Sequence, residues 1–428
     1  MIVVFVLGAL AVLALFVALH RYLWRRLVRD VSAPGGWYRR VGTVLAFVLP
    51  LTSLGALLGG RELPLAGERW LAWPGYLWLA VLIYLTFALL VGEAVRPLLR
   101  RALDRRAAAR TDEVVPEAVT VPVEVPPAAP RPAPTAATAE PAAAPAATDE
   151  PAAGATRRQF VARTVAAASV AVAAGTVGYG TYGVLRGPRL KNVTIPLAKL
   201  PARADGYRIA VVSDIHLGPI LGRAHTQRIV DTINGARPDL VAIVGDLVDG
   251  TVADLGPAAE PLAGLRARDG SYFVTGNHEY FSGAAPWVDF VRELGVHPLE
   301  NARVELPGFD LAGVNDISGA DHHAAPDYGR ALGDRDRTRA AVLLAHQPVM
   351  IHEAVKHGVD LQLSGHTHGG QLWPGNYIAE LANPTVAGLD RYGDTQLYVT
   401  RGAGAWGPPV RVGAPSDITI VKLVSLRA

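Results

Sequence analysis

The chain has 428 residues, of which 50% are hydrophobic, and its formal net charge is +3. This length leaves room for more than one domain. Because the chain contains no cysteine, disulfides, zinc–thiolate sites and thiol nucleophiles are excluded. Many of the arginines lie beside long apolar runs, which is typical of a membrane protein rather than of a nucleic-acid-binding surface.

Three runs in the first quarter of the chain carry no charged side chain, namely residues 1–19, 41–60 and 70–92. Each run is about as long as a helix that spans a bilayer. Buried helices of a soluble core are the alternative, but three such runs favour a membrane region with three transmembrane helices over 1–110. A fourth uncharged run, 164–185, consists mainly of Ala, Val and Gly and is less hydrophobic.

A Pro/Ala-rich segment, 111–156, separates the third run from the fourth and is expected to be a disordered linker. The sequence "TRRQFVAR" follows at 156–163. Paired arginines before a weakly hydrophobic stretch resemble a twin-arginine export signal, although such signals are usually N-terminal. The alternative is an ordinary charge cluster at a membrane edge. Because no cleavage site is evident, we expect residues 157–186 to form an uncleaved fourth transmembrane anchor.

The distribution of arginine predicts the topology. The loop 20–40 contains six arginines and the segment 96–110 contains another six, whereas 61–69 contains two that are balanced by two glutamates. Basic loops are normally cytoplasmic, so the linker is expected inside and the N-terminus outside. The fourth run is ambiguous by itself, because basic residues lie on both sides of it. The parity of the first three runs places the C-terminal half of the chain outside the cytoplasm.

The pattern changes at about residue 190, where short apolar strands alternate with helical stretches. Predicted strands cover 207–214, 239–246, 270–277, 341–347 and 359–366. The segment 225–238 has the spacing of an amphipathic helix. This alternation predicts an α/β domain over 190–428, with mainly parallel strands near its site.

All five predicted strands end in side chains that can bind metals. In chain order these are Asp214 and His216, Asp246 and Asp249, Asn277 and His278, His346, and finally His366 and His368. Sites of α/β proteins form at the carboxyl ends of strands, so we expect these side chains to converge on one edge of one sheet. One such pair could be accidental, but five consecutive strand ends predict a metal centre.

The order of these motifs resembles the calcineurin-like metallophosphoesterase superfamily, over about 200–428. Its pattern of D-x-H, G-D-x-x-D, G-N-H-D/E, H and G-H-x-H is matched throughout, and the form "GHTHGGQ" resembles bacterial membrane-associated members. The resemblance implies a four-layer αββα sandwich. It also implies two metal sites that share Asp246. Asp214, His216 and His368 would complete the first site, and Asn277, His346 and His366 would complete the second.

Two divalent ions that share a carboxylate can also share a water, which loses a proton readily and becomes a nucleophile toward phosphorus. The nitrogen and oxygen donors suit Mn, Fe or Zn better than Ca. By resemblance, His278 is the catalytic residue that protonates or stabilises the leaving oxygen. Asp249 is the expected partner that orients His278; the alternative is a turn residue that binds its own backbone.

Gly250 follows Asp249 where the phosphoprotein phosphatases of the family have an arginine, which disfavours phosphoproteins as substrates. Arg401, Trp406 and Arg411 are candidates for binding an anionic or glycosylated substrate; the alternative is that they close the edge of the sheet. Four other histidines lie in or beside predicted helical stretches and are expected at the surface or at helix caps: His225, His297, His352 and His357.

The sequence therefore predicts a multi-pass protein of the cell membrane with an extracytoplasmic, dinuclear-metal-dependent phosphoesterase domain. A metal-bridged hydroxide would attack the phosphate ester of a small-molecule or lipid substrate, with phosphodiesters or pyrophosphates of lipids and envelope precursors favoured. The twin-arginine export machinery is a candidate partner. One alternative is a catalytically silent scaffold or sensor, which would not need His278. Another is a nuclease, but the sequence contains no dedicated nucleic-acid module.

Overall fold

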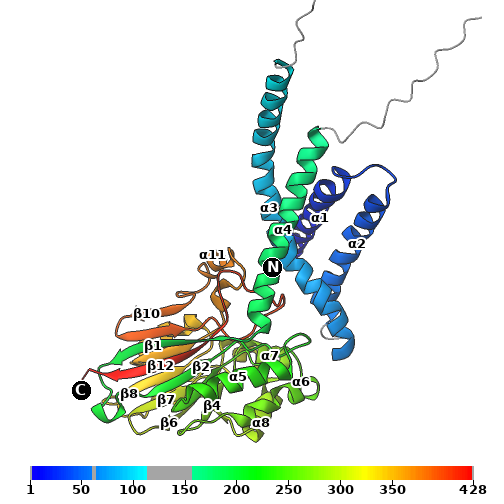
Figure 1. The fold of residues 1–428 in the computed structure, drawn as a ribbon. Coiled ribbons are helices and arrows are strands. Elements are labelled where there is room, and N and C mark those ends of the chain that lie inside the picture. Colours follow the sequence, from blue (N-terminus) through cyan, green and yellow to red (C-terminus); the bar gives the residue numbers. More distant parts are fainter. Residues whose placement is uncertain (1, 60–63, 113–156, 427–428) are drawn as a thin grey trace, which may run out of the picture.

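The computed structural model describes residues 2–59, 64–112 and 157–426. In these ranges, long helices form a bundle that stands on a layered α/β domain (Figure 1). The predicted linker lies outside the described residues except for positions 111 and 112, which still belong to a helix.

Four helices of the bundle contain the four predicted apolar runs: α1 (Ile2–Trp24), α2 (Trp37–Leu58), α3 (Leu65–Asp112) and α4 (Arg157–Leu185). A π-helical turn, Arg25–Arg29, follows α1. All four helices are long and apolar enough to cross a membrane, judged by length and composition. The third helix continues well beyond its apolar run into the arginine-rich segment.

Small residues allow α3 and α4 to approach each other closely. A Cβ atom on Gly92 would lie 2.4 Å from Cγ1 of Val165, so any larger residue at position 92 would separate the two helices. Buried alanines, Ala80 and Ala173, continue this contact. The bundle also touches the α/β domain directly, because the Tyr84 hydroxyl donates to the carbonyl of Trp373 at 3.0 Å.

The α/β domain is built on two six-stranded sheets. The first has the spatial order β1 (Arg189–Leu197), β12 (Asp417–Ser425), β2 (Arg208–Val212), β3 (Leu240–Val244), β4 (Ser271–Val274) and β5 (His297–Pro298). The second has the order β10 (Gly388–Tyr392), β11 (Thr395–Val399), β9 (Leu361–Ser364), β8 (Ala340–Leu344), β7 (Phe309–Gly313) and β6 (Ala302–Glu305). Strands β2 to β5 are parallel, as are β7, β8, β9 and β11.

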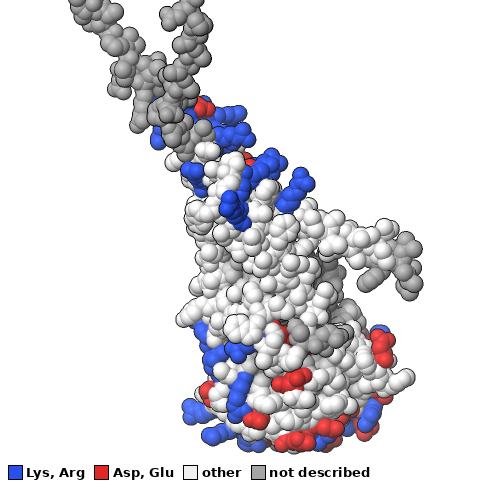
Figure 2. Space-filling model, turned by 90° about the vertical axis from the view of Figure 1, so that its right-hand side faces the viewer, with Lys and Arg blue, Asp and Glu red and all other residues white. Residues whose placement is uncertain are grey.

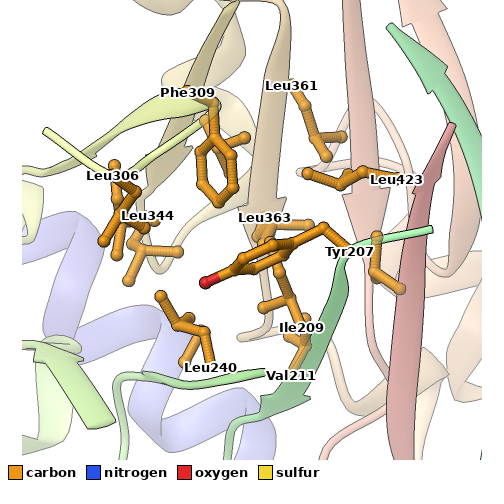
Figure 3. Packing of buried hydrophobic residues seen from close by; sticks show 14 of the residues in the cluster. Tyr207, Ile209, Val211, Leu240, Leu306, Phe309, Leu344, Leu361, Leu363 and Leu423 are labelled. Carbon is orange, nitrogen blue, oxygen red and sulfur yellow. The ribbon is translucent and has the colours of Figure 1, made fainter. Parts of the chain in front are cut away.

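The main hydrophobic core lies between the two sheets (Figure 3). Because side chains alternate along a strand, Ile209 and Val211 of β2 face this core, while Ala210 and Val212 face the helices outside. The second sheet contributes Phe309, whose ring packs edge-on against Tyr207 with 5.0 Å between centroids. Burying each such large side chain stabilises the fold by about 1.5–3 kcal/mol.

Helices cover the outer faces of both sheets. The first sheet packs against α5 (Arg223–Ala236), α6 (Val252–Ala259) and α8 (Ala284–Glu293). The second packs against α9 (Tyr328–Leu332) and α10 (Ile351–Lys356). Two short helices, α7 (Asn277–Ser282) and α11 (Gly375–Ala379), lie in loops. The predicted four-layer αββα sandwich, preceded by apolar helices, is therefore confirmed.

Candidate metal centre

The predicted ligand residues meet at one edge of the sandwich, but they come from both sheets. The loops after β2, β3 and β4 belong to the first sheet, and those after β8 and β9 to the second. The expectation of a single sheet was therefore wrong, because β6 and β7 carry the chain across to the second sheet before β8 begins. A hydrogen bond of 3.0 Å joins the two sides of the site, from the amide of His366 to Oδ1 of Asp214.

Asp214, His216 and His368 form one group of potential metal donors, with ligand atoms within 4.8 Å of one another. The Nε2 atoms of the two histidines are 3.0 Å apart, and Nε2 of His368 lies 3.4 Å from Oδ1 of Asp214. All three side chains are buried. Buried donors that point at one another in this way fit a shared cation.

Asp246, His346 and His366 form a second group of the same kind. Oδ2 of Asp246 lies 3.1 Å from Nε2 of His346 and 3.8 Å from Nε2 of His216, so it stands between the two groups. Oδ1 of Asn277 lies 3.0 Å from Nδ1 of His366. The structure thus brings together all seven residues predicted as metal ligands.

Five of these seven residues adopt a backbone conformation that side chains rarely take. Asp214, His216, Asp246, His366 and His368 have φ between 48° and 73°. Such conformations cost about 1–3 kcal/mol each and persist where the surrounding structure enforces them, most often at functional sites. Here the strain aims side chains from neighbouring loops at one point.

Hydrogen bonds behind the imidazoles fix their orientation. Nδ1 of His346 donates to the carbonyl of Val244 at 2.8 Å, which leaves Nε2 directed at Asp246. Arg411 packs behind His368, with Nη1 donating to its carbonyl at 3.0 Å and Nη2 lying 3.1 Å from Nδ1. Metal-binding histidines usually donate a hydrogen bond from the nitrogen that does not bind the metal, as His346 does here. Arg411 can only donate, so it holds His368 in place through the carbonyl.

One carboxylate oxygen contacts two imidazoles. Oδ1 of Asp249 lies 2.8 Å from Nδ1 of His216 and 2.8 Å from Nδ1 of His278. Burial of Asp249 opposes its ionisation, but the two imidazoles outweigh this effect and lower its pKa to about 2. The contact with His278 is the one expected from sequence, and the contact with His216 is an addition.

The buried carboxylate of Glu279 holds the loops of the site together, a role that we did not infer from the sequence. It accepts hydrogen bonds from the amides of Gly276 at 2.6 Å, Asp246 at 3.0 Å and Leu247 at 2.7 Å. Burial and the nearby Asp246 raise the pKa of Glu279 to about 7. The only sequence signal was its place in "GNHE", directly after His278.

The electrostatics of the site favour a cation. Burial by itself would lower the pKa of His216, but Asp249, Asp246 and Asp214 outweigh burial and raise it to about 9. A site that stabilises a proton on a buried imidazole so strongly carries excess negative charge. A divalent ion can supply the same compensation.

The three predicted substrate-binding residues have different environments. Trp406 is 58% exposed, with its ring 5.7 Å from that of His278, so it lies at the rim of the site. Arg401 is partly exposed and close to Gly369. Arg411 is only 5% exposed and is bonded behind His368, which corrects the expectation of a direct substrate contact.

Of the four histidines expected at the surface or at helix caps, one is buried. His225 is 1% exposed although it lies on an amphipathic helix. Burial and the charges of Arg228 and Arg411 lower its pKa to about 4, so it is neutral at pH 7.

The donors present fit divalent cations. They supply imidazole nitrogens, carboxylates and one amide oxygen in two groups that meet at Asp246. In addition, Nε2 of His346 is buried, and among the residues that the structure describes it has no hydrogen-bond partner of ordinary geometry. A bound cation would satisfy this atom.

Comparisons with known proteins agree with this chemistry. Residues 207–370 match the family model described as calcineurin-like phosphoesterase. A zebrafish (Danio rerio) protein named "Transmembrane protein with metallophosphoesterase domain" is 38% identical over 290 residues, which cover 64% of this chain and 65% of that protein. An uncharacterized metallophosphoesterase of Helicobacter pylori J99 is 38% identical over 57% of this chain and 66% of its own length. The match thus spans just under two thirds of each of these relatives.

An uncharacterized metallophosphoesterase of Aquifex aeolicus is 35% identical over 240 residues, which cover 55% of this chain and 91% of that protein. Solved structures are more remote: phosphopantetheinyl hydrolase from Mycobacterium tuberculosis is 12% identical, covers 45% of this chain and 88% of that one, and has a TM-score of 0.28. The relatives include vertebrate as well as bacterial proteins, so the type is not confined to bacteria. On the sequence relatives and the matched motifs, this chain belongs to the calcineurin-like metallophosphoesterase family.

Proposed function

We propose that this protein is a membrane-anchored, divalent-metal-dependent phosphoesterase that hydrolyses phosphodiester or pyrophosphate bonds. The observation that carries the proposal is the convergence of seven buried or half-buried metal donors from two sheets, in two groups that meet at Asp246. A silent scaffold would not require backbone strain at five of these positions together with an oriented imidazole beside them.

In this proposal Asp214, His216 and His368 would hold one cation and Asn277, His346 and His366 would hold the other, with Asp246 available to both. The donor set suits Mn, Fe or Zn. When bound, two such cations polarise phosphoryl oxygens and lower the pKa of a water molecule between them. The Val244 carbonyl behind His346 and the Asp249 carboxylate behind His216 keep these two imidazoles in the tautomer that can bind a metal through Nε2.

His278 is the proposed proton donor to the leaving oxygen. Its Nδ1 is engaged by Asp249 at 2.8 Å, which orients the ring and leaves Nε2 to carry the transferable proton. The exposed ring of Trp406 beside His278 is the proposed contact for the leaving part of the substrate. Arg401 is the proposed contact for its negative charge.

Contacts between the bundle and the rim of the site support a substrate that resides in or at the membrane. A Cβ on Gly407, next to Trp406, would lie 3.7 Å from the ring of Tyr76 in α3. Leu65, the first residue of α3, packs against the core under the first sheet. Lipid head groups and lipid-linked envelope precursors are therefore the proposed substrate class.

We further propose that the catalytic domain lies outside the cytoplasm. On the face shown in Figure 2, Lys and Arg gather at the end of the bundle that is remote from the catalytic domain, and an uncharged band separates the two. Positive charge concentrates on the cytoplasmic side of membrane proteins. The twin-arginine machinery remains the proposed export route for α4 and the domain that follows.

Hydrolysis by the full-length protein in detergent tests this function. With Mn added, the protein should cleave a bis(aryl) phosphate and lose that activity with a chelator. Cleavage of aryl monoesters alone, with every metal tried, would refute the diester preference and leave the metal site intact. Absence of any metal-dependent hydrolysis over a panel of phospholipids, sugar nucleotides and polyanions would favour the silent scaffold. Cleavage of nucleic acids alone would favour the nuclease.

A further inference from the structure

A cavity lies outside the metal centre, where α4 meets the α/β domain. Its volume is about 290 Å³, and it is formed by the last turns of α4, the first residue of β1 and the loop 411–416. Its aromatic and positively charged lining side chains are Tyr179, Tyr182, Arg186, Arg189 and Arg411.

This cavity carries positive charge that the protein does not neutralise. Within the described ranges, neither Arg186 nor Arg189 forms an ion pair with a carboxylate. The Arg186 guanidinium instead lies 6.0 Å from the ring centre of Tyr182. The predicted topology left these arginines unexplained, because they follow α4 on its non-cytoplasmic side. Unpaired arginines around a cavity favour an anionic ligand, and guanidinium groups are well suited to phosphate oxygens.

The position of the cavity relative to the expected membrane indicates the source of that anion. It lies at the end of an apolar helix that can span a bilayer, beside two tyrosines that are 71% and 62% exposed, Tyr179 and Tyr182. Tyrosines with this exposure are typical of the interface between lipid tails and head groups. A binding site for a soluble anion would not require aromatic side chains at the level of the lipid interface.

We propose that this cavity binds the phosphate-bearing head group of an anionic phospholipid. Arg186 and Arg189 pair with the phosphate, and the tyrosines pack against the glycerol backbone and the start of the acyl chains. The proposal does not depend on the proposed hydrolysis, because the cavity is separate from the two groups of metal donors.

Direct packing contacts connect the cavity to the metal centre. A Cβ on Gly180 would lie 2.8 Å from the carbonyl oxygen of Arg411, so α4 packs directly on this part of the loop. The guanidinium of Arg411 in turn contacts His368. A bound lipid therefore fixes the catalytic edge of the sandwich against the membrane.

Native mass spectrometry of the full-length protein, released from phosphatidylcholine bilayers with and without phosphatidylglycerol, tests the proposal. We expect wild-type protein to retain phosphatidylglycerol in preference to phosphatidylcholine. The double variant Arg186→Gln, Arg189→Gln should lower this retention about tenfold. The matched control, Arg330→Gln with Arg337→Gln, removes two exposed arginines of the α/β domain and should retain the lipid normally.

A second variant keeps every charge and fills the space. Among the described residues no atom lies within 4 Å of a Cβ placed on Gly183, so a side chain can begin there without a clash. Gly183→Leu should therefore fill part of the cavity and also reduce retention. Undiminished retention in both variants would overturn the proposal. Wild-type protein that binds inorganic phosphate or glycerol phosphate, but shows no preference for phosphatidylglycerol, would assign the cavity to a soluble anion and overturn the lipid assignment.

Discussion

Nδ1 of His346 donates to the carbonyl of Val244 across 2.8 Å, and this bond joins the end of β3 in one sheet to the end of β8 in the other. It fixes the imidazole so that Nε2 points at Asp246, 3.1 Å away. The bond that holds the two sheets in register at this edge therefore also prepares a metal donor. One contact between the two sheets thus also contributes to the geometry of the site.

The first prediction concerns Asp246. The substitution Asp246→Asn removes the negative charge between the two groups of donors while keeping the size of the side chain. Turnover should fall by several orders of magnitude, and the metal content measured by mass spectrometry should fall with it, because the shared carboxylate offsets the repulsion between two cations. Asp394→Asn, in the exposed turn between β10 and β11, is the control. Near-normal activity of the Asp246 variant would remove this residue from the centre of the site.

The second prediction concerns His278. The substitution His278→Ala should leave the metal content unchanged and slow hydrolysis about 10²–10⁴-fold, most strongly for substrates with poor leaving groups. Asp249→Asn should slow the same substrates and also weaken metal binding, because Asp249 contacts His216 as well. His352→Ala, an exposed residue of α10, is the control. If His278→Ala loses metal, the roles given to Asn277 and His278 are wrong.

The strands and the site motifs could be predicted from the sequence because both depend on local patterns. Apolar runs that end in Asp, Asn or His marked β2, β3, β4, β8 and β9, and the order of the motifs indicated the family. Periodicity could not predict which of the two sheets each strand belongs to. The alternation of side chains shows which residues share a face of a strand, but it does not show which strands are neighbours. The resemblance to the family implied two packed sheets but did not assign these strands to them.

The sequence also did not predict the roles of residues whose contact partners are distant along the chain. Arg411 was expected to contact substrate, since an arginine near a site usually has a free end, but the carbonyls of Gly404 and Ala414 and the ring of His368 bind its guanidinium. Glu279 received no role because two of its three amide partners, Asp246 and Leu247, lie in the loop after β3, which only the fold brings close to it. The burial of His225 had the same origin, because the backbone of Ala403, distant in sequence, lies against its ring.

The third prediction concerns this buried histidine. His225 has a pKa of about 4 in the folded protein and about 6.5 when unfolded. The unfolded state therefore binds more protons between these values, and stability falls as the pH drops through this window. Between pH 7.5 and pH 5 the residue should cost about 2 kcal/mol of unfolding free energy.

Thermal unfolding of the full-length protein in detergent measures this effect. His225→Leu should lose less stability on acidification than the wild type, since leucine does not titrate. His297→Leu, which replaces an exposed histidine, should behave as the wild type does. Equal losses for wild type and His225→Leu would mean that the pKa of His225 is not lowered in the folded protein.

The fourth prediction concerns topology and export. A reporter that functions only outside the cytoplasm should be active when fused after Ala428, and one that functions only inside should be active when inserted within 111–156. The opposite pattern would overturn the orientation derived from the arginines.

Export is tested separately by Arg157→Lys with Arg158→Lys, which keeps the charge at the start of α4 but removes the paired arginines. Loss of the outer reporter signal, with Arg105→Lys and Arg106→Lys unaffected, would support the twin-arginine route. Unimpaired delivery would mean that the pair acts only as positive charge at the membrane edge.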